Sequence, residues 1–170
     1  EEDDALDAMF RELAPVVSLA KEIDRCILSE EEIADDASNG LRSVRRAMKT
    51  AAEKIRTQLN SLVVNSRTYL QDGVITMRNG RYCVPVKAEH KSNVPGMVHD
   101  QSSSGSTIFV EPLSVVKLNN ELRELEIREQ KEIEAVLAAL SNQTCDHLDE
   151  LTLDLELIGE LDFIFAKAAL

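Results

Sequence analysis

The chain has 170 residues, of which 44% are apolar and only 4% aromatic, so aliphatic side chains must form the core of one domain, or of one domain with a small insert. This composition favours helix-on-helix packing and excludes an intrinsically disordered protein. The net charge of −12 argues against a nucleic-acid-binding surface that covers the whole chain.

Cysteine usage and hydropathy limit the cellular setting. The three cysteines are far apart and form no CxxC pair, so we expect reduced thiols in a cytoplasmic protein rather than a zinc site or a disulfide framework. No apolar run approaches the ~20 residues of a membrane span, so we expect no membrane partner. The chain lacks an initiator methionine and stops within a helical pattern, and we therefore expect a segment of a longer protein.

The first part of the chain has a helical pattern. Apolar residues recur at spacings of three and four over residues 4–24, which predicts a first helix. Pro15 should kink or restart this helix, because proline lacks a backbone donor and clashes with the preceding turn. Ser29 and Glu32 then form a candidate capping box. A near-heptad apolar stripe predicts a second helix over residues 41–70, packed along its length against a partner helix.

The face of the second helix opposite to its apolar stripe is basic. One interpretation is a solvated face with some ion pairs, and the other is a stripe that faces phosphates. The residues concerned are Arg42, Arg45, Arg46 and Lys49.

Residues 73–112 are the only part of the chain without a helical pattern, and they hold three of the four prolines. Asn79-Gly80 predicts a type I′ hairpin between strands at residues 74–78 and 81–89. Pro85 marks the second strand as an edge strand or a bulge, because a central strand needs the donor that proline lacks. Two further strands, at residues 96–101 and 107–110 around a serine-rich turn, would complete a small antiparallel sheet.

A long helix is expected to begin at Pro112, since proline is tolerated at the first helical position. Glu129 interrupts its apolar stripe, Ser141-Asn142 marks a break, and a last helix runs to Ala168. The predicted fold class is mainly α with a small antiparallel β subdomain, in which a long-helix bundle carries a β-rich insert. The expected parts are residues 1–72, 73–112 and 113–170.

Charge is segregated along the chain. Residues 74–110 carry four Lys and Arg against two Asp and Glu, a net charge of +2, whereas residues 111–170 carry −9. The β-rich insert is therefore the expected positive end of an acidic protein.

The sequence shows no constellation for catalysis, cofactor binding or a metal. The serine-rich turn lacks the lysine of a phosphate-binding loop, and neither HExxH nor a nucleophile elbow occurs. His90, His99 and Asp100 are close in sequence but lack further ligands, so we interpret them as strand and turn residues. We expect no catalytic, cofactor-binding or metal-binding residue in this chain.

Residues 80–122, GRYCVPVKAEHKSNVPGMVHDQSSSGSTIFVEPLSVVKLNNEL, resemble a signature of the second bacterial MutS family (MutS-two). Its pattern runs close to GRYVIPVK, then GIVHDQSxSGxTxFIEP, then VVxLNNxLxELE. The flanking residues 33–38, 69–72 and 161–168 are similar as well, so the resemblance covers nearly the whole chain. The signature residues without an assigned role are His99, Asp100, Ser104, Gly105, Glu111, Asn119 and Asn120.

The resemblance implies a parent protein with a helical core, lever and clamp, a MutS-type ATPase that uses ATP and Mg, and a C-terminal nuclease domain. Such proteins are homodimers described as suppressors of homologous recombination that bind branched DNA, and as sensors that split collided ribosomes. This chain would be the non-catalytic core, lever and clamp portion.

Two hypotheses follow from the residues and the resemblance together. In the first, the insert is a clamp that contacts the backbone of DNA or ribosomal RNA without reading its sequence. In the second, the chain is a structural module for protein–protein interaction or dimerisation. The candidate contacts of the first hypothesis are Arg78, Arg81, Lys87, His90 and Lys91.

Overall fold

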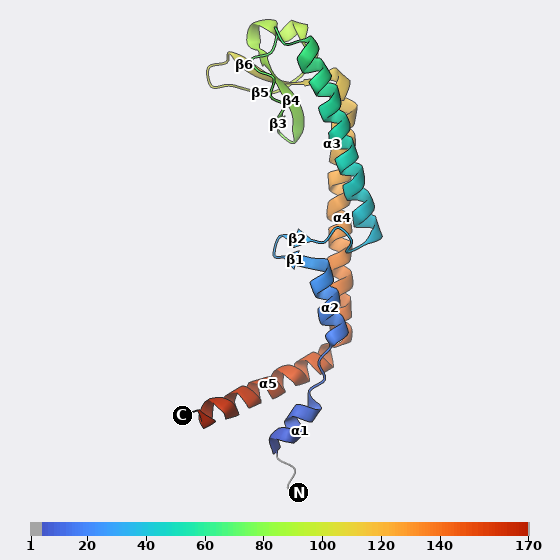
Figure 1. Cartoon of the computed structure of the whole chain (residues 1–170), viewed down its shortest axis with the longest axis vertical. Helices are drawn as coiled ribbons and strands as arrows, with labels where there is room; N and C mark the ends of the chain where they lie inside the picture. Colours follow the sequence, from blue (N-terminus) through green and yellow to red (C-terminus); the bar gives the residue numbers. More distant parts are fainter. Residues whose placement is uncertain (1–4, 170) are drawn as a thin grey trace. The chain divides into compact units, whose positions relative to one another are not determined.

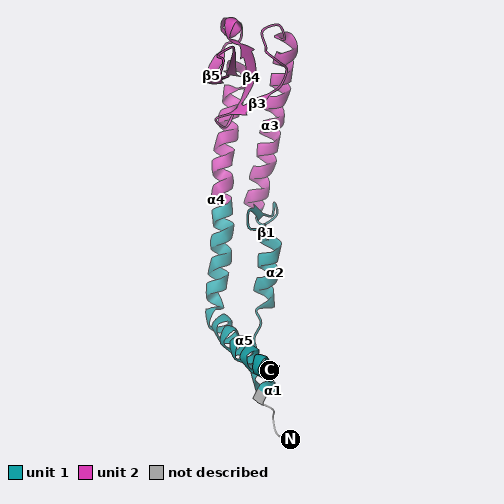
Figure 2. Ribbon diagram, turned by 90° about the vertical axis from the view of Figure 1, so that its left-hand side faces the viewer, with its two compact units in different colours: residues 1–38, 133–170 teal, residues 39–132 magenta. Residues whose placement is uncertain are grey.

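The computed structural model describes residues 5–169, which divide into two compact units (Figure 2). One unit comprises residues 39–132, and the other comprises residues 5–38 and 133–169. The elements, labelled in Figure 1, are α1 (Ala5–Glu12), α2 (Val17–Cys26), β1 (Ile27–Ser29), β2 (Glu32–Ile33), α3 (Asn39–Asn65), β3 (Thr76–Arg78), β4 (Arg81–Lys87), η1 (Ala88–Asn93), β5 (Gly96–Gln101), β6 (Thr107–Pro112), η2 (Leu113–Val115), α4 (Val116–Asp146) and α5 (Leu148–Ala168). Most described residues are helical, and the strands are all antiparallel, so the predicted fold class is confirmed.

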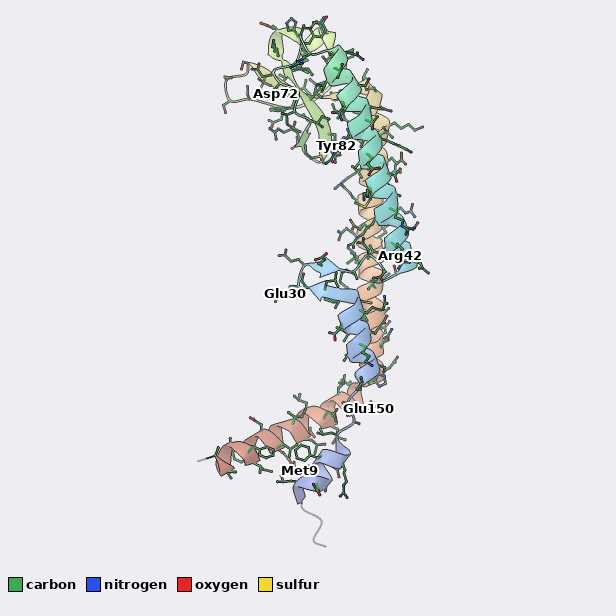
Figure 3. All side chains as sticks on the ribbon, in the orientation of Figure 1. Met9, Glu30, Arg42, Asp72, Tyr82 and Glu150 are labelled. Atoms are coloured by element: carbon green, nitrogen blue, oxygen red, sulfur yellow. The ribbon has the colours of Figure 1, made fainter. Side chains whose placement is uncertain are left out.

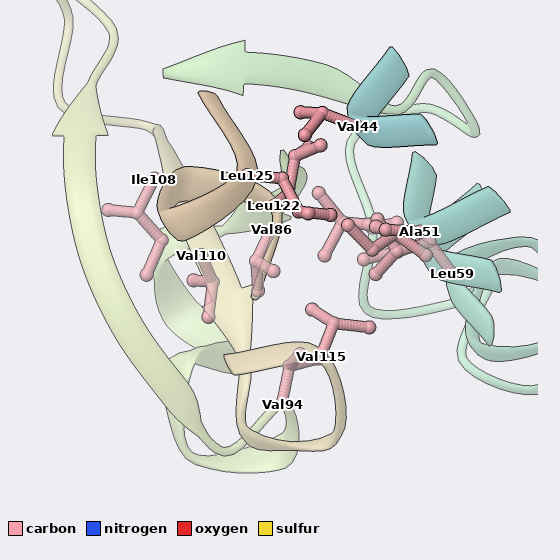
Figure 4. Packing of buried hydrophobic residues seen from close by; sticks show 13 residues of the cluster. Val44, Ala51, Leu59, Val86, Val94, Ile108, Val110, Val115, Leu122 and Leu125 are labelled. Atoms are coloured by element: carbon pink, nitrogen blue, oxygen red, sulfur yellow. The ribbon is translucent and has the colours of Figure 1, made fainter. Parts of the chain in front are cut away.

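Within the unit of residues 39–132, α3 and the first half of α4 lie side by side and run in opposite directions. The apolar stripe of α3 meets that of α4, as its near-heptad spacing predicted. Buried side chains of α3, among them Ile55 and Leu59, share one core with Leu122 and Leu125 of α4. The inner face of the sheet packs on the same core through Val84, Val86, Ile108 and Val110, several of which appear in Figure 4.

The β unit of residues 73–112 is a four-stranded sheet in the order β3-β4-β6-β5. Asn79 and Gly80 both have positive φ, at 50° and 72°, which confirms the predicted hairpin turn. The strands themselves begin and end within two residues of the predicted positions, and β5 has the predicted bounds.

Pro85 corrects one expectation, because β4 is an inner strand with β3 on one side and β6 on the other. Pairing with β3 stops at Cys83. Beyond it the backbone of residues 69–71 takes over: the N–H of Gln71 donates to the Pro85 carbonyl at 3.0 Å, and the N–H of Lys87 donates to the Tyr69 carbonyl at 3.0 Å. Pro85 has no backbone N–H to donate, and it lies beyond the point at which β4 pairs with β3.

The second unit contains α1, α2, α5, the rest of α4 and a short hairpin. Cys26, Val136 and Leu140 form its small buried cluster. The hairpin of β1 and β2 replaces the predicted capping box at Ser29 and Glu32, which was wrong. Its exposed turn carries Glu30, labelled in Figure 3.

Other helix boundaries differ from expectation. The chain restarts at Pro15, with α1 ending at Glu12 and α2 beginning at Val17, as predicted; residue 4 lies outside the described residues. The second helix ends at Asn65 rather than at residue 70, and Pro112 closes β6 rather than opening a helix. The expected break at residues 141–142 is wrong, since α4 continues to Asp146.

No helix among residues 5–169 combines the length and the apolar character needed to cross a membrane.

Substitution by alanine should change the free energy of unfolding in opposite directions at two glycines of the chain. A Cβ at Gly96 would collide with the carbonyl oxygen of Glu111 and with the Val110 side chain, whereas a Cβ at Gly159 in α5 would meet nothing within 4 Å. We expect Gly96→Ala to lower the free energy of unfolding by about 1–3 kcal/mol, the usual cost of overpacking. Gly159→Ala should raise it by about 0.5–1 kcal/mol through helix propensity. Urea denaturation followed by circular dichroism measures both, and equal effects would contradict the close β5–β6 approach.

Candidate nucleic-acid interface

A buried carboxylate lies at the centre of the β unit. The Glu111 side chain, on β6, has no exposed surface. Its Oε1 accepts hydrogen bonds from Nη2 of Arg81 at 2.6 Å and from Nδ2 of Asn119 at 2.9 Å, while its Oε2 lies 2.6 Å from Nε2 of His99. One carboxylate therefore connects β4, β5, β6 and α4.

Asn119 joins the helix to the sheet in a second way. It is 1% exposed, its Oδ1 accepts the backbone N–H of Tyr82 at 3.2 Å, and its Nδ2 also donates to the Tyr82 carbonyl at 3.3 Å. The amide thus pairs with β4 much as a neighbouring strand would. Together with Glu111 it holds α4 against the β unit.

The protonation state of Glu111 follows from its surroundings. Burial alone would raise the pKa of this carboxyl, but the hydrogen bonds from Arg81, Asn119 and His99 outweigh burial and hold the pKa below its ordinary value. The carboxylate is therefore ionised at neutral pH, and it has the compensation that a buried charge requires.

Three of the five candidate contacts lie beside an acidic side chain of the β unit; for His90 this is Glu89, with Nε2 3.6 Å from Oε1. The Arg81 side chain is only 17% exposed and is directed at Glu111. Arg78 lies with Nε 3.2 Å from Oδ2 of Asp100 and its guanidinium 4.1 Å from the centre of the Phe109 ring. The side-chain amide of Asn79 also donates to the His99 carbonyl at 3.0 Å, so the β3–β4 hairpin reaches across to β5.

Lys87, His90 and Lys91 lie in or next to η1. Nζ of Lys87 donates to the Thr68 carbonyl at 3.3 Å, and the His90 ring packs on Tyr69 with centroids 5.3 Å apart. Lys91 is exposed. These three side chains therefore lie in one region, and Lys87 and His90 also have local contacts there.

The members of the basic stripe of α3 differ in exposure. Arg42, labelled in Figure 3, is exposed, as are Arg46 and Lys49. Nε of Arg45 lies 2.7 Å from Oε1 of Glu129 on α4, and both side chains are largely covered. This ion pair explains why Glu129 interrupts the apolar stripe of α4.

The remaining signature residues lie in the β5–β6 turn and on α4. Gly105 has a φ of 71°, which the turn requires, and Oγ of Ser104 lies 2.8 Å from Oγ of Ser106. Asn120 is exposed next to the buried Asn119. Across residues 5–169, no group of three or more His, Cys, Asp or Glu side chains is placed to hold a metal ion.

The two structural units differ more in net charge than the segments of the sequence do. Residues 39–132 carry 15 Lys and Arg against 10 Asp and Glu, a net charge of +5. The remaining residues carry 4 against 21, a net charge of −17. The exposed cations of α3 and η1 thus belong to a positive unit.

No family model matches the chain. Proteins named endonuclease MutS2, in contrast, match it from end to end: the protein of Agathobacter rectalis is 58% identical over 172 residues, and that of Lachnospira eligens is 55% identical over 170 residues. The protein of Lachnoclostridium phytofermentans is 54% identical over 169 residues. These matches cover 98–100% of this chain but only 21–22% of each relative.

The chain is similar along its whole length to a segment of MutS2 proteins. It spans about a fifth of the length of the MutS2 relatives that it matches. The resemblance to the second MutS family is thereby confirmed at the level of sequence. Its assignment to the core, lever and clamp remains a prediction.

The structure assigns contacts to signature residues whose role the sequence left open. His99, Glu111 and Asn119 meet in the buried network, and Asp100 pairs with Arg78. The available signal was weak: Glu111 directly follows the predicted strand of residues 107–110, and Asn119 lies in the predicted helix next to an apolar position, Leu118. A buried polar residue needs a partner, but the sequence did not indicate which residues would supply it.

The Glu111 network makes stability depend on pH. Because the pKa of Glu111 is lowered in the folded chain, its contribution is present above the ordinary glutamate pKa and is lost as the pH falls through the lowered value. We expect Glu111→Gln to lower the free energy of unfolding by about 3 kcal/mol at pH 7, because it leaves Arg81 uncompensated. The difference from the unsubstituted chain should shrink below about pH 4.

Urea denaturation from neutral to acid pH checks this expectation. Glu121→Gln on α4 is the matched control, since Glu121 is exposed and the charge change is the same. A Glu111→Gln effect that stays constant into the acid range would contradict the assignment of an ionised, paired carboxylate.

The three thiols should differ in reactivity. Burial raises the pKa of the Cys83 thiol to about 11 and also raises that of Cys26, whereas Cys145 is exposed. Since the thiolate is the nucleophile, iodoacetamide at about pH 8 should modify Cys145 first, with Cys26 and Cys83 following only on unfolding. Peptide mass spectrometry over a time course measures the order, and rapid labelling of Cys83 in the folded chain would show that the β unit opens readily.

Proposed function

We propose that this chain is the part of a MutS2-type protein that holds a nucleic-acid backbone without reading its sequence, and that passes on motion driven by the ATPase of the parent protein. The concentration of positive charge in residues 39–132 carries the proposal. Phosphate contacts by Lys and Arg give binding that is independent of sequence and sensitive to salt.

The exposed cations of this unit are the proposed contacts. Arg46 and Lys49 on α3 and Lys91 on η1 are exposed. Arg81 serves a different purpose in the proposal, since its guanidinium is committed to the buried Glu111. The net charge of +5 is modest, so we expect weak binding by a single copy.

The lever part of the proposal rests on the tie between α4 and the sheet. Asn119 and Glu111 connect the start of α4 to β4, β5 and β6 through hydrogen bonds that are removed from solvent. A displacement of α4 along its axis would therefore carry the β unit with it. This is the behaviour expected of a clamp on a lever.

For the parent protein, we propose the properties that its relatives and the resemblance indicate. The relatives are named endonucleases, and we place that activity, together with the binding of ATP and Mg, in residues outside this chain. A cytoplasmic homodimer would present two copies of the positive unit and raise the affinity for a polymer. Branched DNA and ribosomal RNA are the two candidate targets.

Charge reversal tests the proposal. We expect the chain to bind a labelled four-way DNA junction weakly at about 50 mM salt and to lose that binding steeply towards about 200 mM. The double substitution Arg46→Glu with Lys49→Glu should lower the affinity by about tenfold or more and reduce the salt slope by about two. The pair Lys87→Glu with Lys91→Glu should do the same if the η1 region also contacts phosphate. Fluorescence anisotropy measures each.

Lys21→Glu is the control, because Lys21 is exposed on α2 in the acidic unit. It changes the net charge without touching the proposed surface. Binding that does not depend on salt, or that falls equally in Lys21→Glu, would refute the phosphate contacts.

A second candidate function is a protein–protein interaction module. Side chains of α5 are unusually exposed for apolar residues, with Leu155 at 72% and Phe163 at 61%. Leu155 also lines an apolar hollow of about 440 Å³, together with Val17, Ala20, Leu151 and Ile158. If this surface mediates self-association, substituting Leu155 and Phe163 by Ser should abolish it. Analytical ultracentrifugation measures the self-association, and DNA binding should remain intact.

A further inference from the structure

Arg78, at the end of β3, is held by three contacts that form a small platform. Its guanidinium lies 4.1 Å from the centre of the Phe109 ring, and its Nε lies 3.2 Å from Oδ2 of Asp100. Its Nη1 donates to the Met77 carbonyl at 3.3 Å. The platform combines side chains of β3, β5 and β6, so the guanidinium is presented in one orientation.

The Asp100 carboxylate is placed on this platform by its own strand. Asp100 pairs with Phe109 in the β5–β6 register, directly after a bulge between Val98 and Asp100. Its Oδ1 accepts the backbone N–H of Gln101 at 2.8 Å, which leaves Oδ2 for Arg78. A bulge redirects a side chain relative to a regular strand, and here it directs a carboxylate at a stacked arginine.

A carboxylate in this position resembles the ligand that an arginine platform binds. Asp100 offers Arg78 a single oxygen, and the buried Nε makes no hydrogen bond with it, whereas a phosphodiester can present paired oxygens to the guanidinium fork. The Arg78 and Asp100 side chains are 38% and 50% exposed, and exposed ion pairs are weak. An incoming phosphate can therefore exchange with Asp100 without unfolding the sheet.

We propose that the Arg78–Phe109 platform is a phosphodiester-binding site that Asp100 occupies in the free protein. The proposal rests on the proposed nucleic-acid function and adds a competitor that is built into the same site. A polyanion anchored elsewhere on the unit displaces Asp100, because its next phosphate is present at high effective concentration. A single free phosphate does not, so the site favours polymers over small anions.

Asp100→Asn tests the site, since asparagine keeps an oxygen that can accept the Gln101 N–H while losing the charge. We expect it to tighten binding of a labelled four-way DNA junction about two- to fivefold, the range set by a surface ion pair. Asp72→Asn is the matched control: Asp72 is exposed, and its Oδ1 accepts the Val74 N–H, which asparagine also allows. Arg78→Gln should remove the gain from Asp100→Asn, and circular dichroism checks that each variant is folded.

Parallel titrations with inorganic polyphosphate distinguish phosphate binding at this site from the binding of nucleic acid. A gain for polyphosphate that depends on Arg78, without DNA binding, would support the site and refute the proposed function. DNA binding that Asp100→Asn leaves unchanged, or tightens no more than Asp72→Asn does, would overturn the site alone. A gain that persists with Arg78→Gln would also overturn it, and a chain that binds neither polymer would refute both proposals.

Discussion

One buried carboxylate organises the β unit and its attachment to the helices. Glu111 has no contact with water, so its charge is stable only because Arg81, His99 and Asn119 surround it. Each of these partners comes from a different element. From charge alone, Arg81 and His99 would be expected at the surface. Instead, both side chains help to stabilise the inside of the sheet.

This support changes which cations are available for a ligand. Arg81 is used inside the unit, and Arg78 and Arg45 face carboxylates of the same unit. Arg46 and Lys49 on α3 and Lys91 on η1 remain exposed. The proposed functional surface is spread over α3 and η1. Such a distribution suits a polymer that is held along its length rather than a compact ligand.

The sequence predicted the architecture of the β unit well, because local chemistry decides it. Asn79-Gly80 admits few alternatives to a tight turn, and alternating apolar residues specify the inner face of the sheet. The β1–β2 hairpin was missed because Ser29 and Glu32 fit a helix start equally well, and the choice was made by packing against Cys26 and its neighbours. Pro85 was misjudged for a related reason: the pairing of β4 with β3 stops two residues earlier, at Cys83, which no local pattern reveals.

The site was harder to predict because its decisive contacts join residues far apart in the chain. The pairing of Arg81 with Glu111 spans 30 residues, and that of Arg45 with Glu129 spans 84. Spacing along one element carries no information about such partners. What the sequence did show was a polar residue where an apolar one was expected, at Glu129, and that anomaly marked an ion pair.

The pairing of Arg45 with Glu129 has a mechanical consequence for the two antiparallel helices. Heptad-like stripes are nearly self-similar, so α3 and α4 alone have little to stop one from sliding a turn past the other. The ion pair favours a single alignment, and at the start of α3 the backbone of Gly40 lies close to the Glu132 carboxylate of α4. At the opposite end of the pair, Asn119 fixes α4 to β4. The ion pair thus favours one alignment of α3 and α4, and such a fixed alignment is what the proposed lever needs if an axial push on one helix is to move the other with it.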